Sequence, residues 1–327
     1  MEKINPENTL VVQTGKIGDM ILTTPLFSGL KNLFPETRLK VLASPVNKDI
    51  ALNHSSVDEV IIFSKNIFKN LPLINSLYKK SDLWIDTKDN YSSTGYLLAN
   101  FFKPAYSIGF KFENKKTAFH DFLNDYVNGS HAVDINISPL NFFGVKSGKS
   151  DIRPYYEIPD IVVNKFKDFF ADKYHRNILI NVSAGNQSRY LPEETWLRIL
   201  NYLKYGKEVF NVFITGLEKD YELINNIILK SGIEKIVYIK TKSIIETSEV
   251  VRNSDFIITP DTSVVHICSA FNKNVVAVYP DVKWNTDKFR PLSDNNEIVF
   301  SDDKNSISDT KPEKIIDAFV RLAGRVN

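Results

Sequence analysis

The sequence predicts an α/β protein made of two doubly wound domains that face a cleft. Short β-branched runs alternate with segments whose apolar residues recur at helical spacing, which is typical of a parallel sheet with helices on both faces. The alternation stops at residues 148–160, a stretch with two prolines and no period, and then restarts. A chain of 327 residues can supply a core to each domain. We therefore expect domains at 1–150 and 151–327.

In the first domain, four strands are expected, at residues 9–13, 38–43, 59–63 and 83–86. Three helices are expected after or between them, at 20–34, 67–80 and 93–102, and one more at 131–145. Pro25 lies inside the first helical pattern, so we expect that helix to start late, with Pro25 in its first turn, or to be kinked there.

The second domain begins with a helix at 162–174, after which the alternation resumes. Strands are expected at 177–182, 209–215, 235–239, 255–258 and 274–279. Helices are expected between or after them at 193–205, 219–231, 243–252 and 264–271. A final amphipathic helix at 311–324 could pack back on the N-terminal domain.

Composition limits the classes of function. A formal net charge of +2 gives no general signal for binding polyanions and argues against a nucleic-acid protein. The lone cysteine, Cys268, excludes an intrachain disulfide and fits a reducing compartment. The first eight residues are polar, and no stretch approaches the roughly 20 apolar residues that span a bilayer. We expect a cytoplasmic protein, with peripheral contact with the inner membrane left open.

In open α/β sheets, ligands bind at the carboxyl ends of the strands, near a topological switch point. The loop after the first strand is Gly15-Lys16-Ile17-Gly18-Asp19, which matches neither the G-x-G-x-x-G nor the G-x-x-x-x-G-K-[ST] pattern. Its glycines allow a ligand to approach the backbone, and Asp19 adds a carboxylate at a helix start. A purely structural role for Asp19, stabilising the helix dipole, is equally compatible with the sequence.

A second loop of similar design is Thr259-Pro260-Asp261-Thr262-Ser263-Val264-Val265-His266, in which a buried strand runs into a helix. The unpaired N–H groups of a helix start attract phosphate, and the hydroxyls of Thr262 and Ser263 stand beside them. Alternatively, Asp261 or Thr262 merely caps the helix. His266 lies about one turn further, where a lone histidine is more often a core residue than a catalyst.

Two other loops follow strands of the second domain. Residues 181–192 contain a single cation, Arg189, whose guanidinium could hold a phosphate through two hydrogen bonds or could simply be solvated. In residues 215–220, Glu218 or Asp220 could accept hydrogen bonds from a ribose or cap a helix. No set of residues has metal-ligand spacing, and no nucleophile–His–acid arrangement stands out.

Taken together, these loops resemble glycosyltransferase family 9, typified by the bacterial ADP-heptose:lipopolysaccharide heptosyltransferases. The resemblance runs in order from about residue 9 to 280. The matching pieces are Gly15-Lys16-Ile17-Gly18-Asp19-Met20 with Pro25 and residues 30–35, Asp82-Leu83-Trp84-Ile85-Asp86, His131-Ala132-Val133-Asp134 with Gly144, Ser188-Arg189-Tyr190-Leu191-Pro192 with Trp196, and residues 259–266.

The resemblance implies a GT-B fold, inversion at the anomeric carbon, no metal, and no cofactor beyond the nucleotide sugar, ADP-heptose. It implies that Asp19 is the general base, that the N-terminal domain binds the acceptor and that the C-terminal domain binds the donor. The donor-binding candidates are Ser183, Arg189, Gly216, Glu218, Asp261, Thr262, Ser263 and His266. The acceptor-binding candidates are Lys16, Gly18, Lys111 and Lys115. The sequence departs from the family at Ser263, usually glycine, and at Arg189, usually lysine.

The acceptor that the resemblance implies is an acidic, phosphorylated, lipid-linked saccharide or related glycan. A candidate surface for it combines Lys103, Lys111, Lys115 and Lys116 with Phe110, Phe112 and Phe119, although an ordinary solvated loop would look the same. Three alternatives remain open at this point: a transferase for another nucleotide sugar, a two-domain protein that binds a ligand without chemistry and, more remotely, a dehydrogenase. A dehydrogenase is disfavoured because no acidic residue follows a proper glycine fingerprint.

Overall fold

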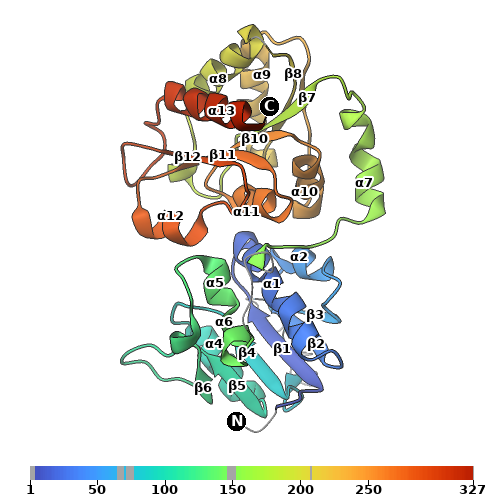
Figure 1. Cartoon of the computed structure of the whole chain (residues 1–327), viewed down its shortest axis with the longest axis vertical. Coiled ribbons are helices and arrows are strands. Elements are labelled where there is room, and N and C mark those ends of the chain that lie inside the picture. The colour runs from blue at the N-terminus through green and yellow to red at the C-terminus, as the bar shows by residue number, and fades with distance from the viewer. Residues whose placement is uncertain (1–3, 65–69, 71–76, 146–151, 207, 327) are drawn as a thin grey trace. The chain divides into compact units, whose positions relative to one another are not determined.

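The computed structural model describes residues 4–64, 70, 77–145, 152–206 and 208–326 (Figure 1). The chain divides into two compact units, Met1–Glu157 and Ile158–Asn327, called here the N-terminal and C-terminal units. Each contains one six-stranded parallel sheet with helices packed on it. The expected domain boundary at 150/151, and most of the expected helix at 67–80, lie outside the described residues.

The sheet of the N-terminal unit has the strand order β3-β2-β1-β4-β5-β6. Its strands are β1 (Asn8–Gln13), β2 (Arg38–Ala43), β3 (Glu59–Ile62), β4 (Leu83–Asp86), β5 (Tyr106–Gly109) and β6 (Asp121–Phe122). Its helices include α1 (Ile17–Leu33), α2 (Lys48–Leu52), α4 (Ser93–Phe102), α5 (Ala132–Asn136) and α6 (Ser138–Phe142).

The sheet of the C-terminal unit has the order β12-β11-β10-β7-β8-β9. Its strands are β7 (Arg176–Asn181), β8 (Phe210–Thr215), β9 (Ile236–Tyr238), β10 (Phe256–Pro260), β11 (Asn274–Tyr279) and β12 (Asn296–Phe300). Its helices include α7 (Asp160–Phe166), α8 (Glu193–Tyr205), α9 (Tyr221–Ser231), α10 (Ile244–Arg252), α11 (Ser263–Ala270), α12 (Lys283–Phe289) and α13 (Pro312–Val326).

Both sheets therefore have the Rossmann order, in which the third, second, first, fourth, fifth and sixth strands of the unit lie side by side. The switch points fall between β1 and β4 and between β7 and β10. The amino ends of these strand pairs are joined in the same way. Asp82 accepts the N–H of Asn8 at 2.8 Å, and Asp255 accepts the N–H of Asn177 at 2.7 Å. Residues four positions after these pairs therefore correspond between the two units. Val12 of β1 corresponds to Asn181 of β7, and Asp86 of β4 corresponds to Thr259 of β10.

Apolar side chains of the central strands anchor the helices. In the C-terminal unit, α8, α9 and α13 share one core with the sheet, which contains Trp196, Ile224 and Phe319. The last helix, α13, packs on β11, β12 and α8 of its own unit. In the N-terminal unit, Trp84 of β4 stacks on Phe102 of α4, with ring centroids 6.1 Å apart. These contacts fix the strand ends from which the loops of both units leave.

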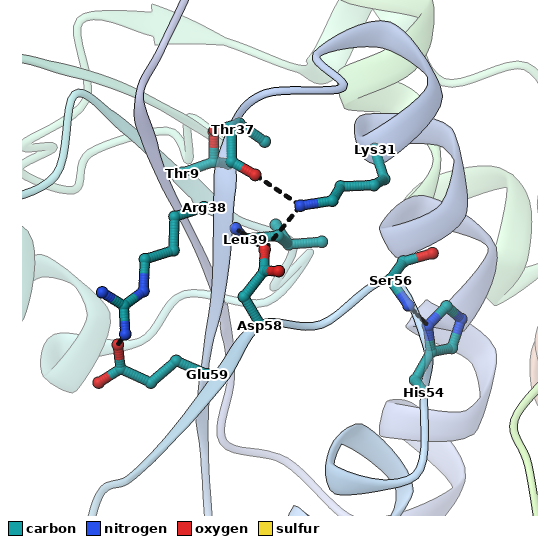
Figure 2. Close-up of polar contacts among 9 residues, drawn as sticks. All are labelled: Thr9, Lys31, Thr37, Arg38, Leu39, His54, Ser56, Asp58 and Glu59. Carbon is teal, nitrogen blue, oxygen red and sulfur yellow. Dashed lines mark hydrogen bonds and ion pairs between the residues drawn. The ribbon is translucent and has the colours of Figure 1, made fainter.

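Charged groups join β2 and β3 at their amino ends (Figure 2). Asp58 accepts hydrogen bonds from the Lys31 ammonium and from the Leu39 N–H, both at 2.7 Å. The Lys31 ammonium also donates to the Thr37 carbonyl at 2.7 Å, so α1 is tied to the start of β2. The opposite, carboxyl edge of the sheet carries the loops of interest.

Two helix predictions need correction. Helix α1 begins at Ile17 and continues through Pro25, so a late start is wrong. Pro25 has no N–H to bond the Ile21 carbonyl, and the Thr24 hydroxyl donates to that carbonyl instead, at 2.7 Å. The helix expected at 131–145 is divided into α5 and α6, since Pro139 has no N–H to continue the first one.

Sequence patterns did not predict α2, β5, β6, α12 and β12, whereas strands or helices are observed near most of the expected positions. In the part of the chain that the structure describes, no helix is long and apolar enough to cross a membrane.

Candidate active site

The start of α11 lies at the carboxyl end of β10, at the switch point of the C-terminal unit. Thr262 is the N-cap residue, and its hydroxyl accepts the Val264 N–H at 3.3 Å. Ser263 is the first helical residue, so its N–H has no acceptor within the helix. Both residues are partly exposed. Capping thus accounts for the hydrogen bond that the Thr262 hydroxyl accepts. The helix start still carries a positive partial charge that could attract an anion.

Arg189 and Asp261 form an ion pair beside this helix start. One guanidinium nitrogen of Arg189 donates to the Asp261 carbonyl at 2.9 Å, and another lies 3.2 Å from the carboxylate. The carboxylate also accepts from the Asn285 amide at 2.8 Å and is almost fully buried. The guanidinium makes the two contacts through two separate nitrogens, whereas a lysine would have to reach both oxygens with one. The geometry holds a guanidinium next to the start of α11.

The Asn181 amide, which the sequence analysis did not single out, links β7 to this region. Its nitrogen donates to the Thr259 hydroxyl at 2.9 Å, to the Ser183 carbonyl at 3.2 Å and to the Thr262 hydroxyl at 3.4 Å. The signal in the sequence was an amide directly after the apolar run at 178–180. This amide joins the two loops that leave the switch point.

Ser183 and Gly216 lie together at the ends of β7 and β8. The Ser183 hydroxyl accepts the Leu217 N–H at 2.7 Å and donates to the Asp220 carboxylate. A Cβ at Gly216 would be 2.6 Å from that hydroxyl oxygen, so the contact needs a glycine. Glu218 instead has an 85% exposed side chain and pairs with Lys240 at 3.1 Å. The structure places Glu218 apart from this cluster.

Two further residues of α11 are buried, the candidate His266 and the lone cysteine, Cys268. His266 is 5% exposed, and its ring centroid lies 6.1 Å from that of Phe289 on α12. Burial raises the pKa of the Cys268 thiol well above its ordinary value, so this group stays protonated. Both positions suit core residues of the helix.

In the N-terminal unit, Asp19 is in the first turn of α1. Its Oδ2 accepts the Lys16 N–H at 2.8 Å, while its Oδ1 has no hydrogen bond among the described residues. The loop itself is braced by Asn47, whose amide donates to the Gln13 and Gly15 carbonyls at 3.0 and 3.1 Å. The carboxylate therefore stabilises the helix start through one oxygen and leaves the other available.

The remaining acceptor candidates are spread over this unit. Gly18 is partly buried within α1, and the Lys16 side chain is exposed. Lys111 and Lys115 are exposed in the loop after β5, with ammonium groups 5.4 Å from the Phe122 ring centroid and 5.3 Å from that of Tyr91, respectively. Lys103 instead ends α4, before β5, at the other edge of the sheet. The four lysines of the expected patch do not form one surface.

Over the described ranges, no group of three or more His, Cys, Asp or Glu side chains lies close enough together to hold a metal ion.

Comparison with known proteins gives a family. The model of glycosyltransferase family 9 (heptosyltransferase) matches residues 71–317. An Escherichia coli (strain K12) protein named "Putative lipopolysaccharide heptosyltransferase 4" is 24% identical over 276 residues, which cover 83% of this chain and 74% of the relative.

Solved structures share the fold. A family 9 glycosyl transferase from Veillonella parvula superposes with a TM-score of 0.81 at 17% identity, covering 98% of this chain and 97% of the other. The E. coli ADP-heptose lps heptosyltransferase II gives a TM-score of 0.75 at 18% identity, with 98% and 99% covered. The E. coli heptosyltransferase WaaC with ADP gives 0.74 at 15% identity, with 97% and 98% covered.

Proposed function

The chain belongs to glycosyltransferase family 9 and is a glycosyltransferase of GT-B fold, and from that premise we propose that it moves a heptose from ADP-heptose to a lipopolysaccharide core or related glycan. Membership of this family sets aside the alternatives of a dehydrogenase and of a binding protein without chemistry. The names of the relatives support the donor and the acceptor. The observation that carries the proposal is the start of α11, with Thr262, Ser263 and Arg189 around it.

In this proposal the donor diphosphate binds at the start of α11. The Ser263 N–H, the Thr262 and Ser263 hydroxyls and the Arg189 guanidinium are all hydrogen-bond donors, which suits a dianionic group. Asp261 would hold Arg189 in place without facing the ligand, because its carboxylate is buried. Ser183 and Gly216, at the ends of the neighbouring strands, would contact the nucleoside. Glu218 would reach a ribose only after leaving Lys240.

The reaction we propose is a direct displacement. The acceptor hydroxyl gives its proton to Oδ1 of Asp19, its oxygen bonds to the anomeric carbon, and the bond from that carbon to the diphosphate breaks. The configuration inverts, and ADP leaves with both electrons of the broken bond. The donors at α11 stabilise this developing charge without a metal ion. The Lys16 N–H would orient Asp19 through Oδ2. General-base assistance of this kind is worth about 10²–10⁴ in rate.

The acceptor is assigned to the N-terminal unit, with Lys16 and Gly18 near the base and Lys111 and Lys115 further out. An acidic, lipid-linked saccharide would be attracted by these ammonium groups, and contact with the inner membrane would follow from its lipid. Nucleic acid is not a partner in this proposal.

The test is release of ADP from ADP-heptose by purified protein, with and without lipopolysaccharide core acceptor. We expect slow release alone and faster release with acceptor. Thermal-shift measurements with ADP, UDP, GDP and CDP, and with the matching nucleotide sugars, separate this donor from another one. A larger shift with a different base would replace ADP-heptose while leaving the family and the site intact.

A further inference from the structure

Helix α4 exposes apolar side chains that the core of the N-terminal unit does not use. Its inner face packs in a cluster with Trp84 of β4. The buried residues of the helix are Gly95, Leu98, Ala99 and Phe102. Leu97 and Phe101 lie one turn apart outside this core and are 62% and 49% exposed. A surface helix usually covers its outer face with charged or polar residues, whereas α4 contains no charged residue at all.

The segment that precedes β4 runs alongside the end of α4. The Lys79 N–H donates to the Phe102 carbonyl at 2.8 Å, and the Ala105 N–H donates to the Ser81 carbonyl at 3.0 Å. These bonds hold Tyr78, which is 41% exposed, next to the last turn of the helix. A tyrosine has an apolar ring and a polar hydroxyl, which suits the boundary between water and an apolar phase.

Three exposed lysines, Lys79, Lys80 and Lys103, lie at the same end of the helix, and Lys103 is its C-cap residue. None of them has an ion-pair partner among the residues that the structure describes. Residues 77–81 and 91–105 contain no Asp or Glu. A lysine can lay its carbon stem along an apolar surface and keep its ammonium group in water. This part of the unit therefore combines exposed apolar side chains with positive charge.

The surface formed by these residues is called here the α4 face. It consists of Tyr78, Lys79, Lys80, Leu97, Phe101 and Lys103. Its chemistry matches an anionic lipid bilayer, because apolar side chains can enter the acyl boundary while tyrosine and lysine lie among the headgroups. Each ammonium group near an anionic membrane strengthens binding by about 5-fold. A second copy of this chain matches less well, since a two-fold contact would put two sets of three ammonium groups into one interface.

We propose that the α4 face is a membrane-docking surface through which the protein binds anionic phospholipid directly. The contact is made by the protein's own side chains and needs no lipid-linked acceptor. It therefore does not rest on the proposed function.

The test is co-sedimentation of the full-length protein with two kinds of vesicle, neither of which contains a saccharide. One kind holds phosphatidylcholine and phosphatidylglycerol in equal amounts, and the other holds phosphatidylcholine alone. We expect binding to the anionic vesicles and about 100-fold weaker binding to the neutral ones, because three lysines lose about 5-fold each. Binding to the anionic vesicles should also fall steeply in 1 M salt, which screens the ammonium groups.

Two variants separate the apolar contribution from the charged one. Leu97→Ser combined with Phe101→Ser should weaken binding to the anionic vesicles by about 10-fold or more, because two apolar side chains no longer leave water. Lys79→Gln, Lys80→Gln and Lys103→Gln in one protein should reduce binding to the level seen with neutral vesicles. All substituted side chains are exposed, so the melting temperatures should stay at that of wild type.

Exposed residues of the C-terminal unit supply matched controls. Leu229→Ser combined with Phe169→Ser makes the same apolar-to-polar changes away from the α4 face. Lys173→Gln, Lys304→Gln and Lys311→Gln in one protein removes the same number of charges. Both controls should bind the anionic vesicles as wild type does.

No binding to the anionic vesicles, equal binding to both kinds of vesicle, or full binding by the Leu97→Ser/Phe101→Ser variant would each overturn the proposal. So would a wild-type dimer in sedimentation equilibrium that this variant loses, because the face would then belong to a second copy of the chain. Release of ADP from ADP-heptose is measured on the same samples. Its absence would count against the proposed function, and the vesicle result would stand separately.

Discussion

The two units are alike at the amino ends of their sheets and opposite in chemistry at the carboxyl ends. An aspartate accepts an N–H at the start of the central strand in both, Asp82 in one and Asp255 in the other. At the other end, the C-terminal unit gathers hydrogen-bond donors around the start of α11, including the Arg189 guanidinium. The N-terminal unit places the carboxylates of Asp19 and Asp86 at or near its loops. One scaffold therefore carries hydrogen-bond donors at the carboxyl end of one sheet and carboxylates at that of the other.

The largest effect is expected at Asp19. Asparagine can still accept the Lys16 N–H through its amide oxygen, so the helix start should persist, but it cannot take a proton from an acceptor hydroxyl. Turnover of Asp19→Asn should fall about 10²–10⁴-fold. ADP affinity should not change, because the donor candidates belong to the C-terminal unit. Transfer, ADP calorimetry and melting temperature are measured on wild type and variant.

Near-normal transfer with a lowered melting temperature would show that Asp19 only stabilises the start of α1. The contrast between the two carboxyl edges would then rest on Asp86 alone.

The second prediction concerns the stability of Asp86→Asn against pH. Burial raises the folded-state pKa of Asp86 to about 6, above the ordinary value of an aspartate, so folding favours the protonated form. Below about pH 4 the carboxyl is protonated in both states and costs nothing. Between pH 4 and 6 the free-energy cost of burying the charge grows. Above pH 6 it amounts to about 3 kcal/mol, because the pKa is about 2 higher in the folded state than in the unfolded state. The variant should be more stable than wild type by up to that amount at pH 7.5 and by little at pH 4.

Urea unfolding of both proteins at pH 4, 5, 6 and 7.5 measures this difference. The other charged or titratable residues that line the small pocket beside Asp86 are Lys88, Lys116, Tyr91 and Tyr96. A constant difference at every pH, or a less stable variant at pH 7.5, would mean that Asp86 is supported by the fold as Thr259 is.

The third prediction separates capping from ligand binding at Thr262. Thr262→Val removes a hydroxyl that accepts the Val264 N–H, so the variant should lose about 1 kcal/mol of stability. If the hydroxyl also binds the diphosphate, ADP affinity should fall by about 1–3 kcal/mol. Ser243→Ala is the matched control, because Ser243 caps α10 of the same unit by accepting the Glu246 N–H at 3.2 Å. It should lose similar stability and keep its ADP affinity, as measured by unfolding and calorimetry.

Equal ADP affinities of Thr262→Val and Ser243→Ala would reduce Thr262 to a cap. The anion site would then depend on the Ser263 N–H and Arg189.

Sequence reasoning found the elements that periodicity specifies and missed those that depend on distant contacts. The strands β1 and β10 and the helix α8 were expected within about two residues, because each is a clear apolar or amphipathic pattern. The start of α1 was misplaced because the Thr24 hydroxyl, not a backbone N–H, serves the carbonyl that Pro25 leaves open. Two-residue β6 carries no pattern at all.

The same division holds for the residues of the candidate site, since some could be chosen from the sequence and others only from the assembled sheet. Thr262 and Ser263 follow the end of one strand in the sequence, and Arg189 lies in the loop after another. The structure places Arg189 beside the helix start that Thr262 and Ser263 form. Asn181 and Asp86 could be recognised only after the sheet was assembled, since the contrast between them depends on which residue lies opposite on the next strand. Glu218 shows the converse, because a carboxylate at a strand end can turn to a neighbouring lysine instead.

The smallest effect is expected at the amino edge of the sheet, where Asp58 ties Lys31 to β2 (Figure 2). Burial works against the Asp58 carboxylate, but Lys31 and the Leu39 N–H outweigh it and hold its pKa below the ordinary value. The stability that this gives is present above the unfolded-state pKa and is lost as the pH falls through the folded-state pKa. Because the side chain is 39% exposed, water and salt screen the ion pair, and Asp58→Asn should cost at most about 1 kcal/mol at pH 7.

That cost in stability should shrink at pH 3 and in 1 M salt. Transfer should be unaffected, since the amide oxygen of the substituted side chain could still accept the Leu39 N–H and keep the start of β2 in place. Unfolding at the two pH values, with turnover measured alongside, checks both statements. A loss of turnover in Asp58→Asn would mean that the amino edge is coupled to the loops at the carboxyl edge. The division of each sheet into a structural edge and a functional edge, on which the comparison of the two units depends, would then be wrong.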